Sequence, residues 1–251
     1  LMSLAAGAGA EPPPPGIANP QGRMAAADVE QVAARIKYWA QQIVAAGAEK
    51  DVIQSRASLG RDYSAYQKRD YQYAFAEQAS KLLPPAMASL DKNDKLRDVK
   101  LVSLASPLST MNQVTAQGGL EAMIRHESPA VRFLGWEGYR LVRLVVLAQG
   151  GNAVRTLQQS LARAVVEETS PQVIGQLMQM MTLPPEGAGG GSDQTMKAMR
   201  QQSWDLAVRQ WRAWCVRVAS GDEQMAMAAP NGQRMLKRFA DWGFKTPPWQ
   251  R

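Results

Sequence analysis

The residue types that most often do covalent or metal chemistry are scarce in this chain of 251 residues. It has one cysteine, Cys215, and one histidine, His126. An intramolecular disulfide is therefore impossible, and these two residues alone cannot supply the four ligands of a structural zinc site. A Cys–His pair for nucleophilic catalysis is formally available. Because Cys215 falls on an apolar helical stripe, we predict a buried structural thiol instead.

Paired carboxylates and short catalytic motifs point to no active site. Adjacent acids occur at 167–168 and 222–223, but adjacent helical residues do not face one substrate, so solvated surface is the prediction. The sequence contains no phosphate loop, no Gly-x-Ser-x-Gly turn and no His-Glu-x-x-His motif. Scattered carboxylates can still meet in a fold. We predict a protein that is not an enzyme, with no catalytic, cofactor-binding or metal-binding residues.

Aromatic residues are the first candidates for binding rather than catalysis. Tyr63, Tyr66 and Tyr73 share one face of a helix expected over 62–83, away from its apolar face. Such a face can bind a ligand or a peptide. More often it packs against a neighbouring helix while the hydroxyls reach water. The three tyrosines are therefore candidate partner-binding residues, with helix packing as the alternative.

The basic excess of the chain lies at its C-terminal end. The net charge is +7, and residues 193–251 hold ten Lys or Arg against five Asp or Glu. A helix expected over 193–219 places tryptophans and Cys215 on one face and arginines on the other. Tryptophan beside arginine can stack on bases, whereas the helical spacing favours a core. The candidate partner-binding residues here are Arg209, Arg212, Lys237, Arg238 and Trp249.

Composition and periodicity predict the elements that must position these residues. Helix formers such as Ala, Gln, Leu, Met and Arg are abundant, and strand-like alternation is scarce, which favours an all-α class. Prolines at 84–85 and 107 are expected to end helices, and 230–232 is expected to form a turn. The helices are expected over about 28–47, 62–83, 91–105, 109–125, 128–148, 152–168, 171–183, 193–219 and 233–241.

Two similar segments begin helices 42 positions apart. They are residues 128–132 (SPAVR) and 170–174 (SPQVI), and the period falls in the HEAT and armadillo range. The first resembles the turn and second-helix start of a HEAT repeat, with Pro129, Val131 and Arg132 in matching places. The second keeps the proline and the valine but has Ile174 in place of the arginine. A weaker third copy at 94–99 lacks the proline.

The resemblance to HEAT repeats covers roughly residues 70–183. It implies stacked antiparallel helical hairpins, each covering the apolar face of its neighbour, and hence an α-solenoid with a C-terminal helical extension. The alternative is an irregular helical bundle in which the Ser-Pro pairs only cap two helices.

Composition also divides the chain into segments. Residues 1–10 are typical of the end of a secretory signal, and 11–23 form a Pro-rich linker. A HEAT-like helical domain is expected over 24–183, a Gly-rich linker over 184–192, and a basic Trp-rich helical module over 193–251. The N-terminal pattern predicts a periplasmic or secreted protein, with a cytoplasmic protein bearing an Ala/Gly-rich tail as the alternative. No stretch reaches membrane-spanning length without charge.

These features predict a non-enzymatic scaffold for protein–protein interaction, built from helical repeats that present extended surfaces. The expected partner is a protein. The alternative is nucleic-acid binding through the basic C-terminal module.

Overall fold

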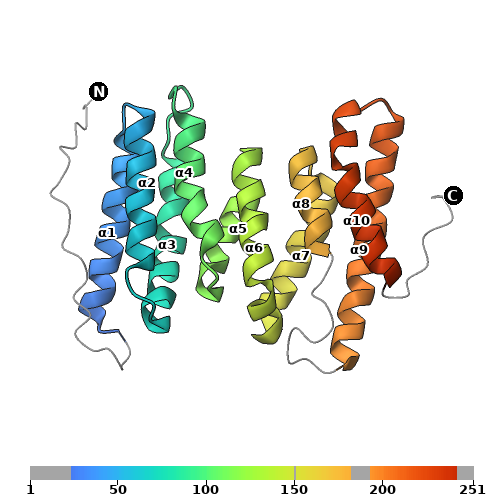
Figure 1. Ribbon diagram of the computed structural model, residues 1–251, viewed down its shortest axis with the longest axis horizontal. Coiled ribbons are helices and arrows are strands. Elements are labelled where there is room, and N and C mark those ends of the chain that lie inside the picture. The colour runs from blue at the N-terminus through green and yellow to red at the C-terminus, as the bar shows by residue number, and fades with distance from the viewer. Residues whose placement is uncertain (1–23, 150, 182–192, 242–251) are drawn as a thin grey trace. The chain divides into compact units, whose positions relative to one another are not determined.

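The all-α class predicted from the sequence is confirmed by a computed structural model (Figure 1). The structure describes residues 24–149, 151–181 and 193–241, which form ten α-helices and two short 3-10 helices and contain no strand. None of the helices in these ranges is both long enough and apolar enough to cross a membrane. The predicted signal remnant 1–10 and the linkers 11–23 and 184–192 lie outside the described residues.

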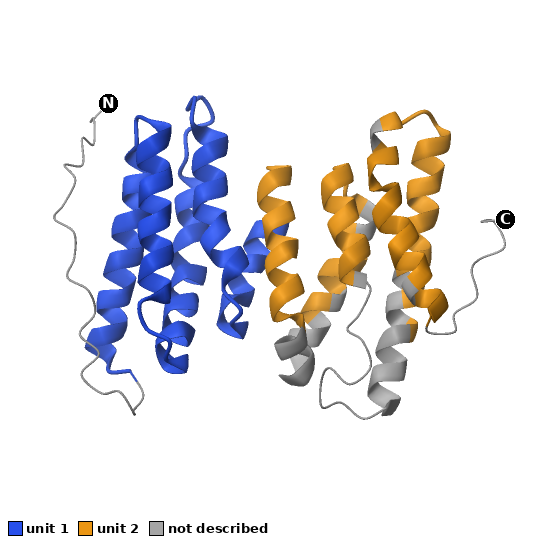
Figure 2. Cartoon of the chain, in the orientation of Figure 1, with its two compact units in different colours: residues 1–127 blue, residues 128–251 orange. Residues whose placement is uncertain are grey.

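The chain divides into two compact units (Figure 2). Unit 1 comprises residues 1–127 and unit 2 comprises residues 128–251. The domains expected over 24–183 and 193–251 stay predictions. Each unit is described on its own below.

Unit 1 is built from helices that contact their second neighbours along the chain. Helix α1 packs against α2 and α3, α3 packs against α4 and α5, and α2 packs against α4. The bounds are α1 Ala26–Ala45, α2 Glu49–Ser64, α3 Arg69–Ala88, α4 Arg97–Thr110, the 3-10 helix η1 Val114–Ala116 and α5 Gln117–Ile124. The largest buried apolar side chains of this core include Ile36, Ile43, Leu59, Tyr71, Phe75, Leu83, Leu101, Leu104 and Leu108.

The expected helix over 62–83 was wrong at both ends. The chain leaves helical conformation between Ser64 and Arg69, so Asp62 belongs to α2 instead. Periodicity missed α2 because it buries serines, Ser55 and Ser58, beside only two large apolar residues. A helix with so few large apolar residues forms because its neighbours cover that face, not because of its own pattern.

The prolines at 84–85 do not end α3, which continues to Ala88. A proline inside a helix costs about 3 kcal/mol, because it removes one donor and crowds the preceding turn. Leu83 and Met87 flank the pair and are 0% and 2% exposed. Burying two such side chains contributes about 1.5–3 kcal/mol each, which offsets half or more of the cost of the two prolines. Pro107 lies inside α4 in the same way and is buried.

Unit 2 follows the same order of contacts. Helix α6 packs against α7 and α8, α8 packs against α9 and α10, and α7 packs against α9. Pro129 and Pro171 are the first residues of α6 and α8, as their Ser-Pro pairs predict. The bounds are α6 Pro129–Gln149, α7 Gly151–Glu167, α8 Pro171–Met181, α9 Asp193–Ala219, the 3-10 helix η2 Glu223–Ala228 and α10 Ala229–Asp241.

The turn expected at 230–232 was also wrong, because these residues form the first turn of α10. Pro230 is tolerated there because the first helical N–H groups have no partner within the helix. Gly232 is required by packing rather than by a turn. A Cβ at this position would lie 2.1 Å from a ring carbon of Trp211, so only glycine lets α10 come this close to the indole.

Candidate functional site

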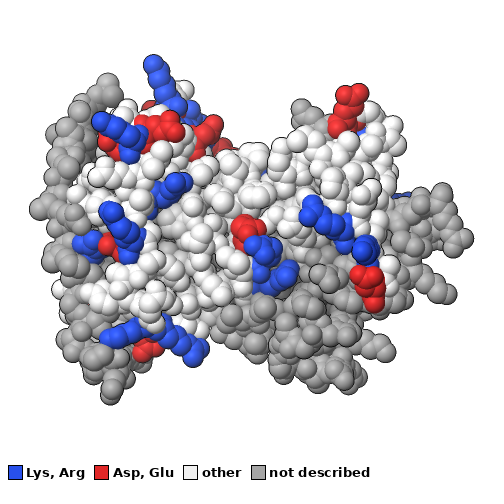
Figure 3. Space-filling view, viewed as in Figure 1, with Lys and Arg blue, Asp and Glu red and all other residues white. Residues whose placement is uncertain are grey.

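Charged side chains occur in small separated groups on the face drawn in Figure 3, several with Lys or Arg beside Asp or Glu. The buried charged residues of the described ranges are Arg35, Lys100 and Glu168. Each of them has a partner of opposite charge. The contacts of each buried charge show whether it can act on a ligand or is occupied by partners within the fold.

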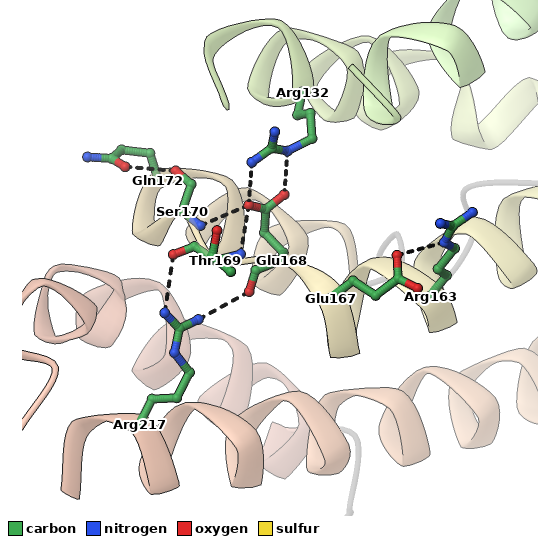
Figure 4. Close-up of polar contacts among 8 residues, drawn as sticks. All are labelled: Arg132, Arg163, Glu167, Glu168, Thr169, Ser170, Gln172 and Arg217. Atoms are coloured by element: carbon green, nitrogen blue, oxygen red, sulfur yellow. Dashed lines mark hydrogen bonds and ion pairs between the residues drawn. The ribbon is translucent and has the colours of Figure 1, made fainter. Parts of the chain in front are cut away.

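Glu168 lies at the centre of the polar cluster of unit 2 (Figure 4). It directly follows α7, and its residue is 9% exposed. Its carboxylate accepts two hydrogen bonds from Arg132 of α6, both at 2.8 Å. The backbone N–H groups of Thr169 and Ser170 donate to the same carboxylate at 2.9 and 2.8 Å. The expected solvated surface at Glu168 is therefore wrong, because a neighbouring helix and the turn itself enclose it.

The environment holds this carboxylate in its charged form. Burial by itself raises the pKa of Glu168. The hydrogen bonds from Arg132, Ser170 and Thr169, together with the Arg132 charge, outweigh burial, so the pKa of Glu168 lies below its ordinary value. A general acid or base needs a pKa close to the working pH. Glu168 is shifted the other way, which fits a structural carboxylate.

Arg217 of α9 extends this cluster through the backbone. Its guanidinium donates to the carbonyl oxygens of Glu168 at 3.2 Å and Thr169 at 3.4 Å, and to the Asp222 carboxylate at 2.9 Å. The turn between α7 and α8 is thus held by α6 on one side and by α9 on the other (Figure 4). The cluster joins four helices of unit 2, and both carboxylate oxygens of Glu168 accept hydrogen bonds within it.

A second enclosed ion pair joins α1 to α2 in unit 1. Arg35 donates two hydrogen bonds of 2.7 Å to the Asp62 carboxylate, and the Trp39 indole donates a third at 2.8 Å. The Tyr71 hydroxyl donates to the backbone carbonyl of Asp62 at 2.6 Å. Burial raises the pKa of Tyr71 above its usual range. These groups lock three helices together rather than form an open site.

Lys100 is the third buried charged residue, and its side chain also makes structural contacts within the protein. It is 3% exposed, and its ammonium donates to the Val44 carbonyl at 2.8 Å and to Asp94 at 2.6 Å. The hydrogen bond from Lys100, joined by one from the Leu96 backbone, lowers the pKa of the Asp94 carboxyl. Sequence patterning cannot find this contact, because Val44 and Lys100 are 56 positions apart.

The three candidate tyrosines do not share one helix face. Tyr63 belongs to α2, Tyr66 to the connection after it, and Tyr73 to α3. Each is half-buried. The ring of Tyr63 lies 5.5 Å from that of Phe75, and the ring of Tyr66 lies 5.0 Å from that of Tyr71.

The polar groups of these tyrosines are engaged as well. Burial raises the pKa of Tyr63, and a hydrogen bond with Gln113 opposes the rise. Arg69 stacks over the ring of Tyr73 at 5.1 Å and donates to its hydroxyl at 3.2 Å. The rings of Tyr63 and Tyr66 thus pack against neighbouring rings, the alternative weighed above. Tyr73 carries the exposed Arg69 beside it.

The basic candidate residues of unit 2 whose side chains the structure describes are exposed, unlike the half-buried tyrosines of unit 1. Arg209, Arg212 and Lys237 are exposed, and none of them makes an ion pair or hydrogen bond within the part of the chain that the structure describes. The side chain of Arg238 and the whole of Trp249 lie outside the described residues. Arg209 and Arg212 lie one turn apart on α9, which places both on its outer side.

The packed face of α9 differs by a few residues from the expected stripe. The structure buries Ala207, Gln210 and Trp211, while Cys215 is only half-buried. Trp211 stacks on Trp214 with ring centres 4.6 Å apart, and the Trp214 indole donates to the Met225 carbonyl at 2.6 Å. These indoles are core groups. Burial raises the pKa of the Cys215 thiol, which disfavours the thiolate needed for nucleophilic chemistry.

Within the described ranges, no three His, Cys, Asp or Glu side chains come together as a metal site. Comparison with family models, curated proteins and solved structures gave no match. The described surface carries exposed acidic side chains as well as basic and apolar ones. Among the described residues, the exposed large apolar side chains are Ile53, Val216 and Met227. They belong to no sequence motif and were not predicted from the sequence.

Proposed function

We propose that this protein is a non-enzymatic scaffold that binds a protein partner and is built from HEAT-like helical hairpins. The observation that carries the proposal is the order of helix contacts. Helix α3 contacts both α1 and α5, and helix α8 contacts both α6 and α10. Helix α2 likewise contacts α4, and α7 contacts α9. Contact between every second helix is the order expected when consecutive hairpins stack.

A recurring ion pair supports the repetition. Arg97, the first residue of α4, pairs with Glu127, two residues before Pro129. Arg132 in the first turn of α6 pairs with Glu168, three residues before Pro171. In both cases an arginine near a helix start holds the turn that leads into the helix two places further along the chain.

Two features favour binding over catalysis: buried charged side chains that are paired within the protein, and exposed apolar side chains. The buried charges are paired internally. Ile53, Val216 and Met227 are 43%, 62% and 65% exposed, and each is a single apolar side chain that a protein partner would cover. On the one face drawn in Figure 3 the charge groups are separated, whereas a nucleic-acid backbone requires a continuous basic stripe.

Affinity capture from native extract, followed by reconstitution with the purified partner, tests the proposal. We expect one protein to bind the purified chain directly, with modest dependence on salt. Changing Ile53, Val216 and Met227 to Asp one at a time is expected to weaken binding at least tenfold for at least one variant. Far-UV circular dichroism should be unchanged, because all three side chains are exposed.

Two results would contradict the scaffold. Tight binding to DNA or RNA without any protein partner, falling linearly in log affinity against log salt, would indicate counterion release at phosphates and the nucleic-acid alternative. A purified activity that is lost only on substitution of specific carboxylates would indicate an enzyme.

A further inference from the structure

One face of α9 is left uncovered by the other helices of unit 2. Arg209, Arg212, Ala213 and Val216 are all exposed, as is Ser220 directly after the helix. Their spacing of three or four residues puts them on a single side. The opposite side carries Trp211 against Gly232 of α10. At about 1.5 Å per residue, the exposed face runs for roughly 16 Å.

The chemistry of this face is apolar at its centre and basic at its edge. Val216 is 62% exposed and lies one turn from both Arg212 and Ala213. Asp205 is exposed near the N-terminal end of the same side, where its carboxylate accepts a hydrogen bond from Gln201. The face therefore combines two arginines with an aliphatic patch and one acid at its margin.

Unit 2 carries more basic than acidic residues. Residues 128–251 hold fifteen Lys or Arg against nine Asp or Glu. Four of those acids are already paired with arginines elsewhere in the unit, as Arg132–Glu168, Arg140–Glu137, Arg163–Glu167 and Arg217–Asp222. Arg209 and Arg212 have no such partner in the described residues.

We propose that the exposed face of α9 from Arg209 onward, together with Ser220 just beyond its end, is a docking surface for an acidic amphipathic helix of a protein partner. The inference rests on the proposed scaffold function and adds the partner's chemistry. Carboxylates one turn apart on such a helix match the spacing of Arg209 and Arg212. An apolar residue beside them covers Val216 and Ala213, in the manner of helix recognition through i, i+3 and i+4 anchors.

The same face fits a nucleic acid poorly. Two arginines supply few phosphate contacts, whereas specific and non-specific nucleic-acid binding draws on many. Val216 has no role against a sugar–phosphate backbone. An acidic helix uses the arginines and the aliphatic patch together, and this combination favours it.

The test uses the full chain and two designed probes. One probe is an 18-residue amphipathic peptide of Leu, Ala and Glu, and the other is the same peptide with every Glu replaced by Lys. Fluorescence anisotropy is expected to show binding of the Glu peptide at least tenfold tighter than that of the Lys peptide. The double variant R209E/R212E should reverse this preference, and Val216→Asp should weaken Glu-peptide binding at least tenfold.

Two variants of exposed residues in unit 1 serve as controls, one a charge reversal and the other an aliphatic-to-aspartate change. Lys37→Glu and Ile53→Asp are expected to alter Glu-peptide affinity less than twofold. Equal binding of both peptides, absence of Glu-peptide binding, or insensitivity to the α9 variants would overturn the docking surface. Single-stranded RNA that binds more tightly than the Glu peptide and is lost in R209E/R212E would also overturn it, in favour of a nucleic-acid surface.

Failure of this inference is distinguishable from failure of the scaffold function. A captured partner that still binds R209E/R212E leaves the scaffold function standing and removes α9 as its docking surface. Glu-peptide binding that depends on α9, with no protein partner recovered from extract, leaves the surface standing and removes the scaffold function.

Discussion

At the scale of single residues, each buried charge of the described chain is held by a partner from a different element. Arg35 reaches from α1 to Asp62 in α2, and Arg132 reaches from α6 to Glu168 beyond α7. A buried pair of this kind adds little over an apolar pair of the same shape, but removing one partner is costly because the other charge stays enclosed. These pairs therefore fix which helices meet.

Loss of Arg35 is expected to leave the Asp62 carboxylate, 15% exposed, without its main partner. We expect Arg35→Ala to lower the free energy of unfolding by about 3 kcal/mol. Urea unfolding followed by circular dichroism measures the change. Lys81→Ala is the control, because Lys81 and Glu77 form an exposed pair within α3, and such pairs contribute less than about 0.5 kcal/mol. Equal effects of the two variants would contradict the role given to Arg35.

Stability should depend on the ionisation of Glu168. Its folded-state pKa is depressed, so its contribution is complete above the unfolded-state pKa of about 4.3 and is lost as pH falls through the folded-state pKa. The difference in unfolding free energy between wild type and Glu168→Gln is expected to be constant above about pH 5.5 and to shrink below about pH 4.3. Urea titrations across this range measure it.

The neighbouring residue supplies the control for this pH dependence. Glu167 is exposed and pairs only with Arg163 on its own helix, so Glu167→Gln is expected to change stability less than Glu168→Gln at neutral pH. A Glu168→Gln effect that grows as pH falls would have the wrong sign and would exclude a stabilising charged Glu168.

At the scale of elements, glycines set how closely helices approach. Gly119 of α5 donates its N–H to the Ser80 hydroxyl of α3 at 2.6 Å. A Cβ at Gly119 would lie 2.9 Å from the Ser80 Cα, which is backbone and cannot turn aside. By helix propensity alone, glycine is unfavourable inside a helix. The structure shows that its missing side chain lets two helices touch.

Gly119→Ala is accordingly expected to lower the free energy of unfolding by about 1–3 kcal/mol, the usual cost of overpacking. Gly60 in α2 provides the opposite case, because nothing lies within 4 Å of a Cβ built there. Gly60→Ala is expected to stabilise by about 0.5–1 kcal/mol through helix propensity alone. Thermal and urea unfolding of both variants compare the signs. Two changes of the same sign would refute the close approach of α5 to α3.

At the scale of the whole molecule, the division into residues 1–127 and 128–251 predicts separable stability. Arg35 and Glu168 are assigned to different units, and the contacts described for each lie within its own unit. Arg35→Ala should therefore speed amide hydrogen exchange in α1 to α3, and Glu168→Gln should speed it in α6 to α9. Exchange followed by mass spectrometry on the full chain measures both. Uniform acceleration along the chain in either variant would show one cooperative unit.

Local information in the sequence determined the helical class and several helix bounds. Helix α9 was expected over 193–219 and is found at Asp193–Ala219, and α6 and α7 lie within one residue of their expected bounds. These helices have strong apolar periodicity or a proline at the first position. Both signals act within one or two turns of the chain and need no distant partner.

Tertiary contacts decided what those local signals could not. Buried Leu83 and Met87 carry α3 through the prolines at 84–85, and the Trp211 ring explains Gly232. Arg132 lies 36 positions from Glu168, yet it turns an expected surface acid into the centre of a cluster. Burial and pairing of this kind depend on residues that only folding brings together. The exposed face of α9 is likewise defined by the contacts that cover its other face.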